Sequence, residues 1–412
     1  MLSPEYLARI AEGSEEIASQ LHTYIIRQII DRMMIRIGRG YDYLFTSSDR
    51  WRIQILQDAG YLLEDITAEL AKYTKRQEKE IKAAMEEAGI KALEYDDKIY
   101  QAAGLSPMPL TQSPALIRLM ERNYRVTLGE WNNYTRTTAE AAQRLFINEC
   151  DFAYNKVLSG TVAYNTAVRE AIESVVSGGV TLVQYRSKNT GDIRNDTIET
   201  ATARAVRTGI SQATAQITLK RMEEMKWEVV LVSAHVGARN IGGIPENHEL
   251  WQGKFYSLPQ YGHRFPDFYY STGYGDITGL CGVNCRHSFG PGDGENNPYD
   301  TIDTEENRKV YEVEQRQRSL ERRVRKTKRE VMGLQEAVKK CQDDVSRLEL
   351  QQTLDRKSYL LQRQNKAYNE FCKMNNLRTQ QERLQIARWN REQAAKARGA
   401  ARRYQNAKGK EE

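Results

Sequence analysis

The feature that most restricts the fold of this chain is a seven-residue repeat of apolar side chains near its C-terminal end. Two sets of positions form the repeat: Val310, Gln317, Val324, Val331, Val338, Val345 and Gln352, and Val313, Leu320, Thr327, Leu334, Cys341 and Leu348. Charged residues occupy most of the flanking positions, and Gly333 is the one glycine between Gly294 and Gly399. A pattern of this length and period predicts a coiled coil.

The repeat weakens after Leu348, and two features farther along predict a turn. Asn375-Asn376 is followed by Thr379-x-x-Glu382, which has the pattern of a capping box that opens a second helix. An antiparallel helical hairpin within one chain is therefore an alternative to a coil between chains. The final residues, 396–412, read KARGAARRYQNAKGKEE and are predicted to be disordered.

Charge is distributed unevenly along the 412 residues. Residues 306–412 contain 28 Lys and Arg against 15 Asp and Glu, a balance of +13, whereas the first 305 residues hold 33 against 40. A basic segment attached to an acidic body predicts contact with a polyanion or with an acidic protein surface. Sequence-independent DNA contact and a merely solvated helix face remain equally open for this segment.

The first 104 residues have a helical pattern throughout. Seven apolar residues form one face at helical spacing: Ile25, Ile26, Ile29, Ile30, Met33, Met34 and Ile37. We expect this face to pack within a helical core, and docking on a partner helix or a membrane surface is the alternative. Separate helices are expected at 51–73 and 77–103, and the proline-rich segment 104–114 predicts a linker.

A second helical region follows this linker. Ser113 as N-cap and Pro114 in the first turn predict the start of a helix. The pair Thr137-x-x-Glu140 predicts a capping box at the start of the next helix. Farther along, the pattern predicts helices at 164–176 and 196–225 and strands at 180–186 and 227–235.

The most unusual composition occurs in residues 233–293, which hold four of the five histidines and eleven of the 27 glycines. Thiolates and imidazoles can share a zinc ion, and the candidate metal ligands are Cys281, Cys285, His287, His235, His248 and His263. The spacing Cys281-x3-Cys285-x-His287 departs from the paired C-x2-C of structural zinc sites. We therefore favour buried thiols and histidines bonded to loop carbonyls, with zinc as the one candidate cofactor.

Other chemistry is weakly indicated. A Cys285–His287 nucleophilic pair is conceivable, but sequence neighbours rarely form one, and the glycines lack the lysine of a phosphate loop. Arg239, Arg264 and Arg286 lie among aromatic residues and could stack on single-stranded nucleic acid, but we prefer an irregular core in which they bind loop carbonyls. We expect no secretory signal and no membrane span, and the five scattered cysteines fit a reducing compartment.

The segment VSAHVGARNIGGIPENHELWQGKFYSL, followed by YGDITGLCGVNCRHSFGPGDGEN, resembles the signature of the phage minor capsid protein 2 family, which is related to the Mu F-like head-morphogenesis proteins of tailed phages. The matching residues are His235, Arg239, His248, Trp251, Gln252, Gly253, Gly273, Tyr274, Gly275, Gly279, Leu280, Gly282, Asn284, Cys285, Arg286 and His287. Arg207 and Thr208 match a helix that precedes the module, and Gly209 stands where relatives often have glutamate. The resemblance covers about 196–292.

The resemblance implies a structural virion protein needed for head assembly, present in a few copies and without enzymatic activity. It implies the portal protein and a major capsid or scaffold protein as partners, oligomeric packing in the virion, and the host cytoplasm as the place of assembly. Residues 306–412 lie outside this signature, and in such a protein they would contact packaged DNA or an acidic scaffold. No membrane partner is expected. The alternative is a metal-dependent hydrolase or toxin-like enzyme that uses the His/Cys module.

These observations together predict a predominantly helical α+β protein. We expect an N-terminal helical region at 1–104 and a second helical region at 113–225. A small loop-rich, Gly/His/Cys-rich Mu F-like module is expected at 226–299. A long basic coiled coil or helical hairpin is expected at 305–405.

Overall fold

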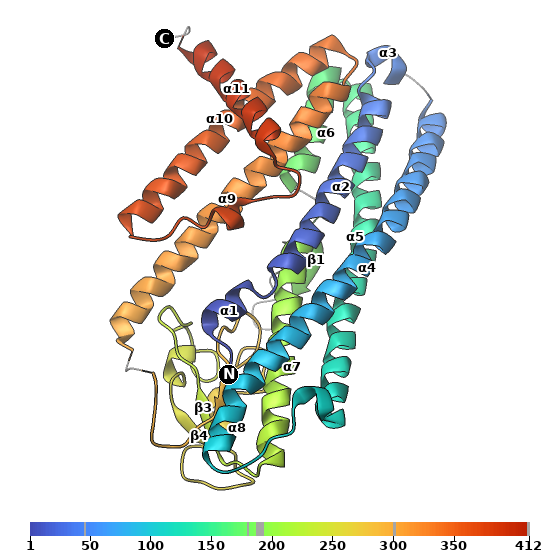
Figure 1. Ribbon diagram of the computed structural model, residues 1–412. Helices are drawn as coiled ribbons and strands as arrows, with labels where there is room; N and C mark the ends of the chain where they lie inside the picture. Colours follow the sequence, from blue (N-terminus) through green and yellow to red (C-terminus); the bar gives the residue numbers. More distant parts are fainter. Residues whose placement is uncertain (45–46, 179–180, 187–192, 300–301, 410–412) are drawn as a thin grey trace. The chain divides into compact units, whose positions relative to one another are not determined.

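The computed structural model describes residues 1–44, 47–178, 181–186, 193–299 and 302–409 (Figure 1). It confirms a predominantly helical α+β fold with small antiparallel sheets. The chain divides into two compact units. The first unit comprises Met1–Glu15, Thr74–Asn132 and Thr202–Gln315, and the second comprises Glu16–Tyr73, Asn133–Ala201 and Arg316–Glu412. Each unit therefore combines segments that lie far apart in the sequence.

Helices build most of the second unit. It contains most of α2 (Glu12–Ile37), all of α3 (Tyr41–Leu44), α6 (Tyr164–Gly178), α10 (Asp344–Met374), η3 (Gln381–Leu384) and α11 (Arg391–Lys408), and parts of α4 (Ser48–Ala102), α5 (Pro114–Leu158), α7 (Ile198–Glu224) and α9 (Thr304–Lys340). Strand β1 (Thr181–Arg186) confirms the first predicted strand, and it pairs antiparallel with β2 (Ile193–Thr197), which was not predicted. All seven residues of the predicted apolar face of α2 are buried, which confirms core packing.

In the second unit, α10 and the part of α9 that follows Gln315 form an antiparallel hairpin (Figure 1). Gln317 Nε2 donates to Tyr368 Oη over 3.5 Å, and Lys357 Nζ lies 2.9 Å from Glu330 Oε2. The hairpin turns at residues 341–343, where the side chain of Asp343 caps α10 by accepting from Ser346 N at 2.8 Å. A hairpin within one chain was a predicted alternative, but its turn at 341–343 was not predicted. The predicted turn at Asn375-Asn376 is present and ends α10, whereas Thr379 does not cap a helix, since α11 begins at Arg391.

This turn overturns the prediction that the heptad repeat continues as one helix to residue 352. Val324, Val331 and Leu334 are fully buried, whereas Val345 is 59% and Leu348 is 60% exposed. The helix that carries the repeat therefore ends before Asp343, because the Asp343 side chain caps the start of a new helix, α10. Pairing between two chains stays a prediction.

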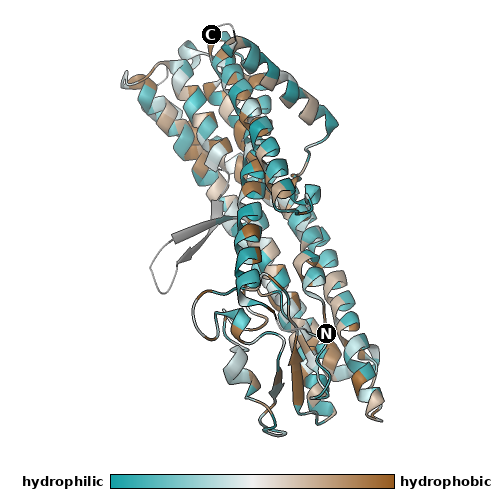
Figure 2. Ribbon diagram, turned by 90° about the vertical axis from the view of Figure 1, so that its left-hand side faces the viewer, coloured by the Kyte–Doolittle hydropathy of each residue, from teal (hydrophilic) through white to brown (hydrophobic). Residues whose placement is uncertain are grey.

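Three other helix predictions were wrong. The two helices expected at 51–73 and 77–103 form the single helix α4. Thr137 does not cap a helix: α5 continues through it, and its Oγ1 donates to the carbonyl of Asn133 at 3.1 Å. The C-terminal segment predicted to be disordered forms α11 through Lys408, with Asn390 as its N-cap. Figure 2 shows that the long helices carry both hydrophobic and hydrophilic residues.

The first unit carries the loop-rich module. Its regular elements are α1 (Pro4–Arg9), η1 (Leu110–Gln112), β3 (Val229–Val232), η2 (His248–Leu250), β4 (Phe255–Ser257), α8 (Phe268–Thr272) and β5 (Phe289–Pro291), together with parts of α4, α5, α7 and α9. The three strands form an antiparallel sheet in the order β4-β3-β5. An apolar core beneath this sheet includes Val230, Trp251, Phe268 and Phe289.

Close contact between two helices favours a glycine at position 209. An ideal Cβ at Gly209 on α7 would lie 2.1 Å from Oγ1 of Thr127 on α5. A larger side chain would require that threonine to move. Within the described part of the chain, no helix combines the length and the apolar character that a bilayer crossing requires.

Candidate functional site

Short turns bring the histidines and cysteines of the module together. Strand β3 leads into the loop that carries His235, and η2 begins at His248. Helix α8 ends at Gly273, whose φ of 59° is left-handed and whose ideal Cβ would lie 2.1 Å from Pro245 Cβ. Any L side chain would be strained there, so glycine is required at this turn. Cys281 and Asn284 also have φ near 60°, which folds the following loop tightly before β5.

His287 is the centre of this cluster and is fully buried. Its Nε2 lies 3.0 Å from Oε1 of Gln252, and its Nδ1 lies 3.6 Å from Sγ of Cys285. Its backbone N–H donates to the same Sγ at 3.4 Å. Because an amide oxygen only accepts, Nε2 must carry the proton and Nδ1 presents its lone pair to the thiol.

Two further histidines contact this ring. The His235 ring stacks on His287 with centroids 4.5 Å apart, and the His248 ring meets it edge-on at 5.3 Å. His248 Nε2 donates to the carbonyl of Thr278 at 3.0 Å. Trp251 closes the cluster, because its ring lies 4.5 Å from His248 and 4.9 Å from His287.

Burial keeps these groups uncharged near neutral pH. Desolvation lowers the pKa of His235 and of His248 to about 4 and lowers that of His287 well below its ordinary value. Desolvation also raises the pKa of Cys285 to about 11 and raises that of Cys281. Neutral imidazoles can bind a metal directly, whereas a thiol must first lose its proton.

Three of the six predicted ligands converge. The donor atoms of His248, Cys285 and His287 all lie within 4.8 Å of one another. His235 contributes a stacked ring to the same cluster, and Cys281 Sγ lies 3.7 Å from the carbonyl of His287. His263 is an exposed residue beside Glu228, outside the convergent group.

The arginines of the module bind loop carbonyls, as we preferred in the sequence analysis. Arg239 donates to the carbonyls of Val283 and Thr278, at 2.9 and 3.4 Å. Arg264 donates to the carbonyl of Gly294 at 3.2 Å, and Arg286 to that of Gly237 at 3.1 Å. These bonds fix loops that have few backbone partners of their own, so the guanidiniums serve the core of the module.

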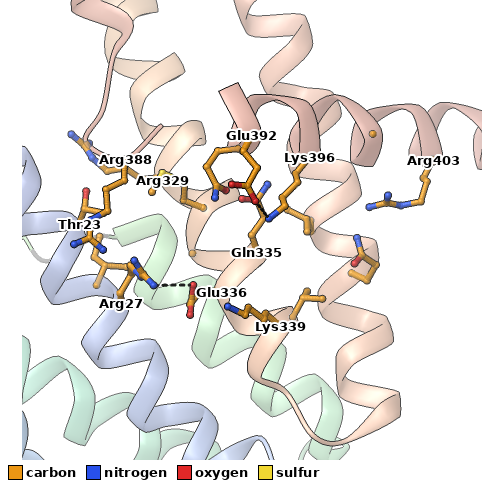
Figure 3. A pocket seen from close by; sticks show the side chains of 18 residues that line it. Thr23, Arg27, Arg329, Gln335, Glu336, Lys339, Arg388, Glu392, Lys396 and Arg403 are labelled. Carbon is orange, nitrogen blue, oxygen red and sulfur yellow. Dashed lines mark hydrogen bonds and ion pairs between the residues drawn. The ribbon is translucent and has the colours of Figure 1, made fainter. Parts of the chain in front are cut away.

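A separate basic cavity of about 570 Å³ lies in the second unit, between α2, α9, α10 and α11 (Figure 3). Its lining includes six cationic and two acidic residues: Arg27, Arg329, Lys339, Arg388, Lys396 and Arg403, and Glu336 and Glu392. Glu336 forms an ion pair with Arg27 at 3.4 Å, and Glu392 forms an ion pair with Lys396 at 2.6 Å. The amide oxygen and nitrogen of Gln335, which also lines the cavity, are buried without a hydrogen-bond partner among the described residues. The lining thus has an excess of positive charge.

Sequence reasoning missed one buried charge network in the second unit. Glu199 Oε1 accepts from His22 Nδ1 at 2.8 Å and from Arg329 Nη2 at 2.7 Å. Burial would raise the pKa of Glu199, but the charge of Arg329 and the contact with His22 outweigh it and lower that pKa. These residues come from α2, α7 and α9, so no local spacing could reveal them. A lone histidine on the apolar face of a predicted helix was the only available signal.

The comparisons with known proteins agree with the signature in the module. The family model described as phage minor capsid protein 2 matches residues 2–360. No curated protein and no solved structure matches the chain significantly. Because the match covers most of the chain, including the helices on both sides of the module, this protein belongs to the phage minor capsid protein 2 family.

Proposed function

We propose that this chain acts in phage head morphogenesis at the portal or the inner capsid, and that basic residues of its C-terminal helices contact packaged DNA. Membership of a minor capsid family supports a structural role in the virion. The portal protein and a major capsid or scaffold protein are the proposed partners. Assembly would take place in the host cytoplasm, with several copies packed in each virion.

The observation that carries the DNA contact is the charge of α11. Its 18 residues contain six Lys and Arg and one acid, Glu392. Arg391, Arg398, Arg402 and Lys408 are exposed and form no ion pair within the described part of the chain. Unpaired exposed cations on one helix attract phosphates without reading sequence. Exposed Arg388 and Lys396 of the basic cavity extend this cationic surface (Figure 3).

The module is proposed to be structural rather than catalytic. Its convergent histidines and thiol are buried, and the rings of Trp251 and His235 pack on His287. A substrate would have to displace this packing before it reached Cys285 or His287. A rigid unit that presents a fixed surface to other virion proteins fits the arrangement better than an active site.

Salt-dependent binding to duplex DNA tests the proposed contact. For the wild type, the logarithm of the association constant should fall linearly with the logarithm of salt concentration. The double variant Arg398→Glu/Arg402→Glu should reduce the magnitude of that slope by about 2, because each phosphate contact contributes about 0.9. Lys82→Glu/Lys91→Glu, which makes the same charge change at exposed positions of the first unit, should leave the slope unchanged. Equal effects of the two double variants would refute a specific role of α11.

Virion composition tests the location. Mass spectrometry of purified particles should detect the chain at a few copies per head, and it should co-purify with the portal protein from infected cells. Filled heads should be lost when the gene is removed. Its absence from purified particles would contradict a role in the virion and leave only a role in assembly.

A further inference from the structure

We propose that the module binds one Zn²⁺ ion through His248, Cys285 and His287, with Cys281 as the fourth ligand. This site would be a structural centre and would go beyond the proposed assembly role. The first three residues form the one convergent set of metal-ligand side chains among the described residues. Two imidazoles with thiolates are a donor set that zinc prefers in proteins.

The spacing of the donor atoms fits a tetrahedral ion. Zinc–sulfur bonds of about 2.3 Å and zinc–nitrogen bonds of about 2.0–2.1 Å place two tetrahedral ligands about 3.5 Å apart. Cys285 Sγ and His287 Nδ1 are 3.6 Å apart. The donor atom of His248 lies within 4.8 Å of both of these atoms, so a small movement of its ring would bring it into position as the third ligand.

Hydrogen bonds outside the ligands hold the required tautomers. Gln252 Oε1 accepts from His287 Nε2 at 3.0 Å, which leaves Nδ1 free to bind an ion beside Cys285. The carbonyl of Thr278 accepts from His248 Nε2 at 3.0 Å and leaves Nδ1 of that ring without a proton. Gln252 is itself fixed, because its Oε1 also accepts from the backbone N–H of His235 at 3.1 Å. Outer partners of this kind accompany nearly all metal-bound histidines.

The thiols of Cys281 and Cys285 both lie near the backbone of His287. The backbone N–H of His287 donates to Cys285 Sγ at 3.4 Å, a bond that a thiolate accepts better than a thiol. Cys281 Sγ lies 3.7 Å and Cys285 Sγ 3.9 Å from the same carbonyl, that of His287. Cys281 lies outside the convergent set, so its role as the fourth ligand requires its side chain to rotate towards the ion. Structural zinc sites are closed by four protein ligands, and a fully buried site offers little room for water.

Each bound thiol loses its proton to solvent, and no electron is transferred. The charge balance is therefore one Zn²⁺ against two thiolates and two neutral imidazoles. In the metal-free alternative, the S–H of Cys285 donates to Nδ1 of His287 and the cluster is an ordinary polar core. The two alternatives predict different metal contents for the same chain.

Metal analysis of the full chain, purified without a histidine tag from zinc-supplemented cells, decides between them. The wild type should contain close to one zinc per chain, and Cys285→Ser and His248→Gln should each contain less than one tenth. His263→Gln, which replaces an exposed histidine of the same module, should retain the wild-type content. A wild type below one tenth of an equivalent, or equal zinc loss in His263→Gln and Cys285→Ser, would overturn the site.

Cobalt substitution provides a spectroscopic readout of the ligands around the ion. Replacing zinc by Co²⁺ in the wild type should produce the visible bands of a tetrahedral ion and sulfur-to-cobalt charge-transfer absorption. Cys281→Ser should keep the tetrahedral bands and lose about half of the charge-transfer intensity. An unchanged charge-transfer intensity would refute Cys281 as a ligand. Removal of the ion by chelation should lower the Tm of the wild type, and added zinc should restore it.

Discussion

Replacing Glu199 by glutamine is the most direct test of what holds the second unit together. Glu199 is 2% exposed and contacts Arg329 and His22, so Glu199→Gln leaves the Arg329 guanidinium, which is 17% exposed, without its charged partner. At 2.7 Å and an effective dielectric constant of 20, the attraction between Glu199 and Arg329 is about 6 kcal/mol. Desolvation offsets part of this energy, and removal of one partner from a buried pair costs about 3–5 kcal/mol.

The amide oxygen of the glutamine can still accept one hydrogen bond, so we expect a loss of about 3 kcal/mol in the free energy of unfolding. For a unit of this size the corresponding decrease in Tm is about 6–12 °C. Urea unfolding followed by circular dichroism would measure the loss. Glu392→Gln removes an exposed partner of Lys396 and should leave the free energy of unfolding almost unchanged, because solvent screens a surface ion pair.

The pH dependence gives a second test of the same residue. The pKa of Glu199 is lowered in the folded chain, so its stabilisation is complete above its unfolded pKa of about 4.3 and is lost as the pH falls towards the folded value. The stability difference between the wild type and Glu199→Gln should therefore be constant from pH 7 to pH 5 and shrink below pH 4. A difference below about 1 kcal/mol at pH 7, or one that grows on acidification, would refute the reasoning.

Two further predictions concern packing and a buried lysine in the second unit. Gly333→Ala should lower the free energy of unfolding by about 1–3 kcal/mol because its Cβ would lie 2.3 Å from Val176 Cγ1. Gly399→Ala, where the nearest atom lies 4.0 Å away, should raise it by roughly 0.5–1 kcal/mol, and changes of equal sign in urea unfolding would contradict the packing argument. Burial lowers the pKa of Lys328 to about 8, so the wild type should gain up to about 3 kcal/mol of stability between pH 8 and pH 10.4. Lys328→Met should abolish that gain. If the free energy of unfolding depended on pH in the same way in both proteins, Lys328 would not be the source of the gain.

The sequence predicted helices and strands well where one pattern dominated a long segment. The apolar face from Ile25 to Ile37, the helix start at Pro114 and the strand β3 were all visible in the pattern. The errors lie at helix boundaries. Thr137 has the spacing of a cap but bonds back to Asn133, since the local signal cannot show that a neighbouring helix keeps the chain helical. Asp343 ends the heptad repeat because its cap competes with continuation of the helix.

The sequence predicted which residue types form the candidate metal site, but not which of the six candidates converge. Cys285 and His287 are close in sequence, and the turn between them brings their side chains together. His248 joins them only through the folding of the loop around Trp251. His263 has the same residue type and lies in the same glycine-rich segment, yet its place beside Glu228 is set by contacts that no spacing encodes.

The structure also changes how the basic C-terminal segment should be tested. Residues 306–412 would be the obvious deletion if they formed a free tail, but α9 supplies Arg329 to Glu199, and Gly333 packs on Val176. A chain without this segment would lose a buried ion pair and expose the α6 surface, so loss of DNA binding on deletion could reflect unfolding alone. Charge reversal at Arg398 and Arg402, which are exposed on α11, leaves the buried contacts in place. Only a variant of this kind separates the electrostatic role of the C-terminal helices from their role in the core of the second unit.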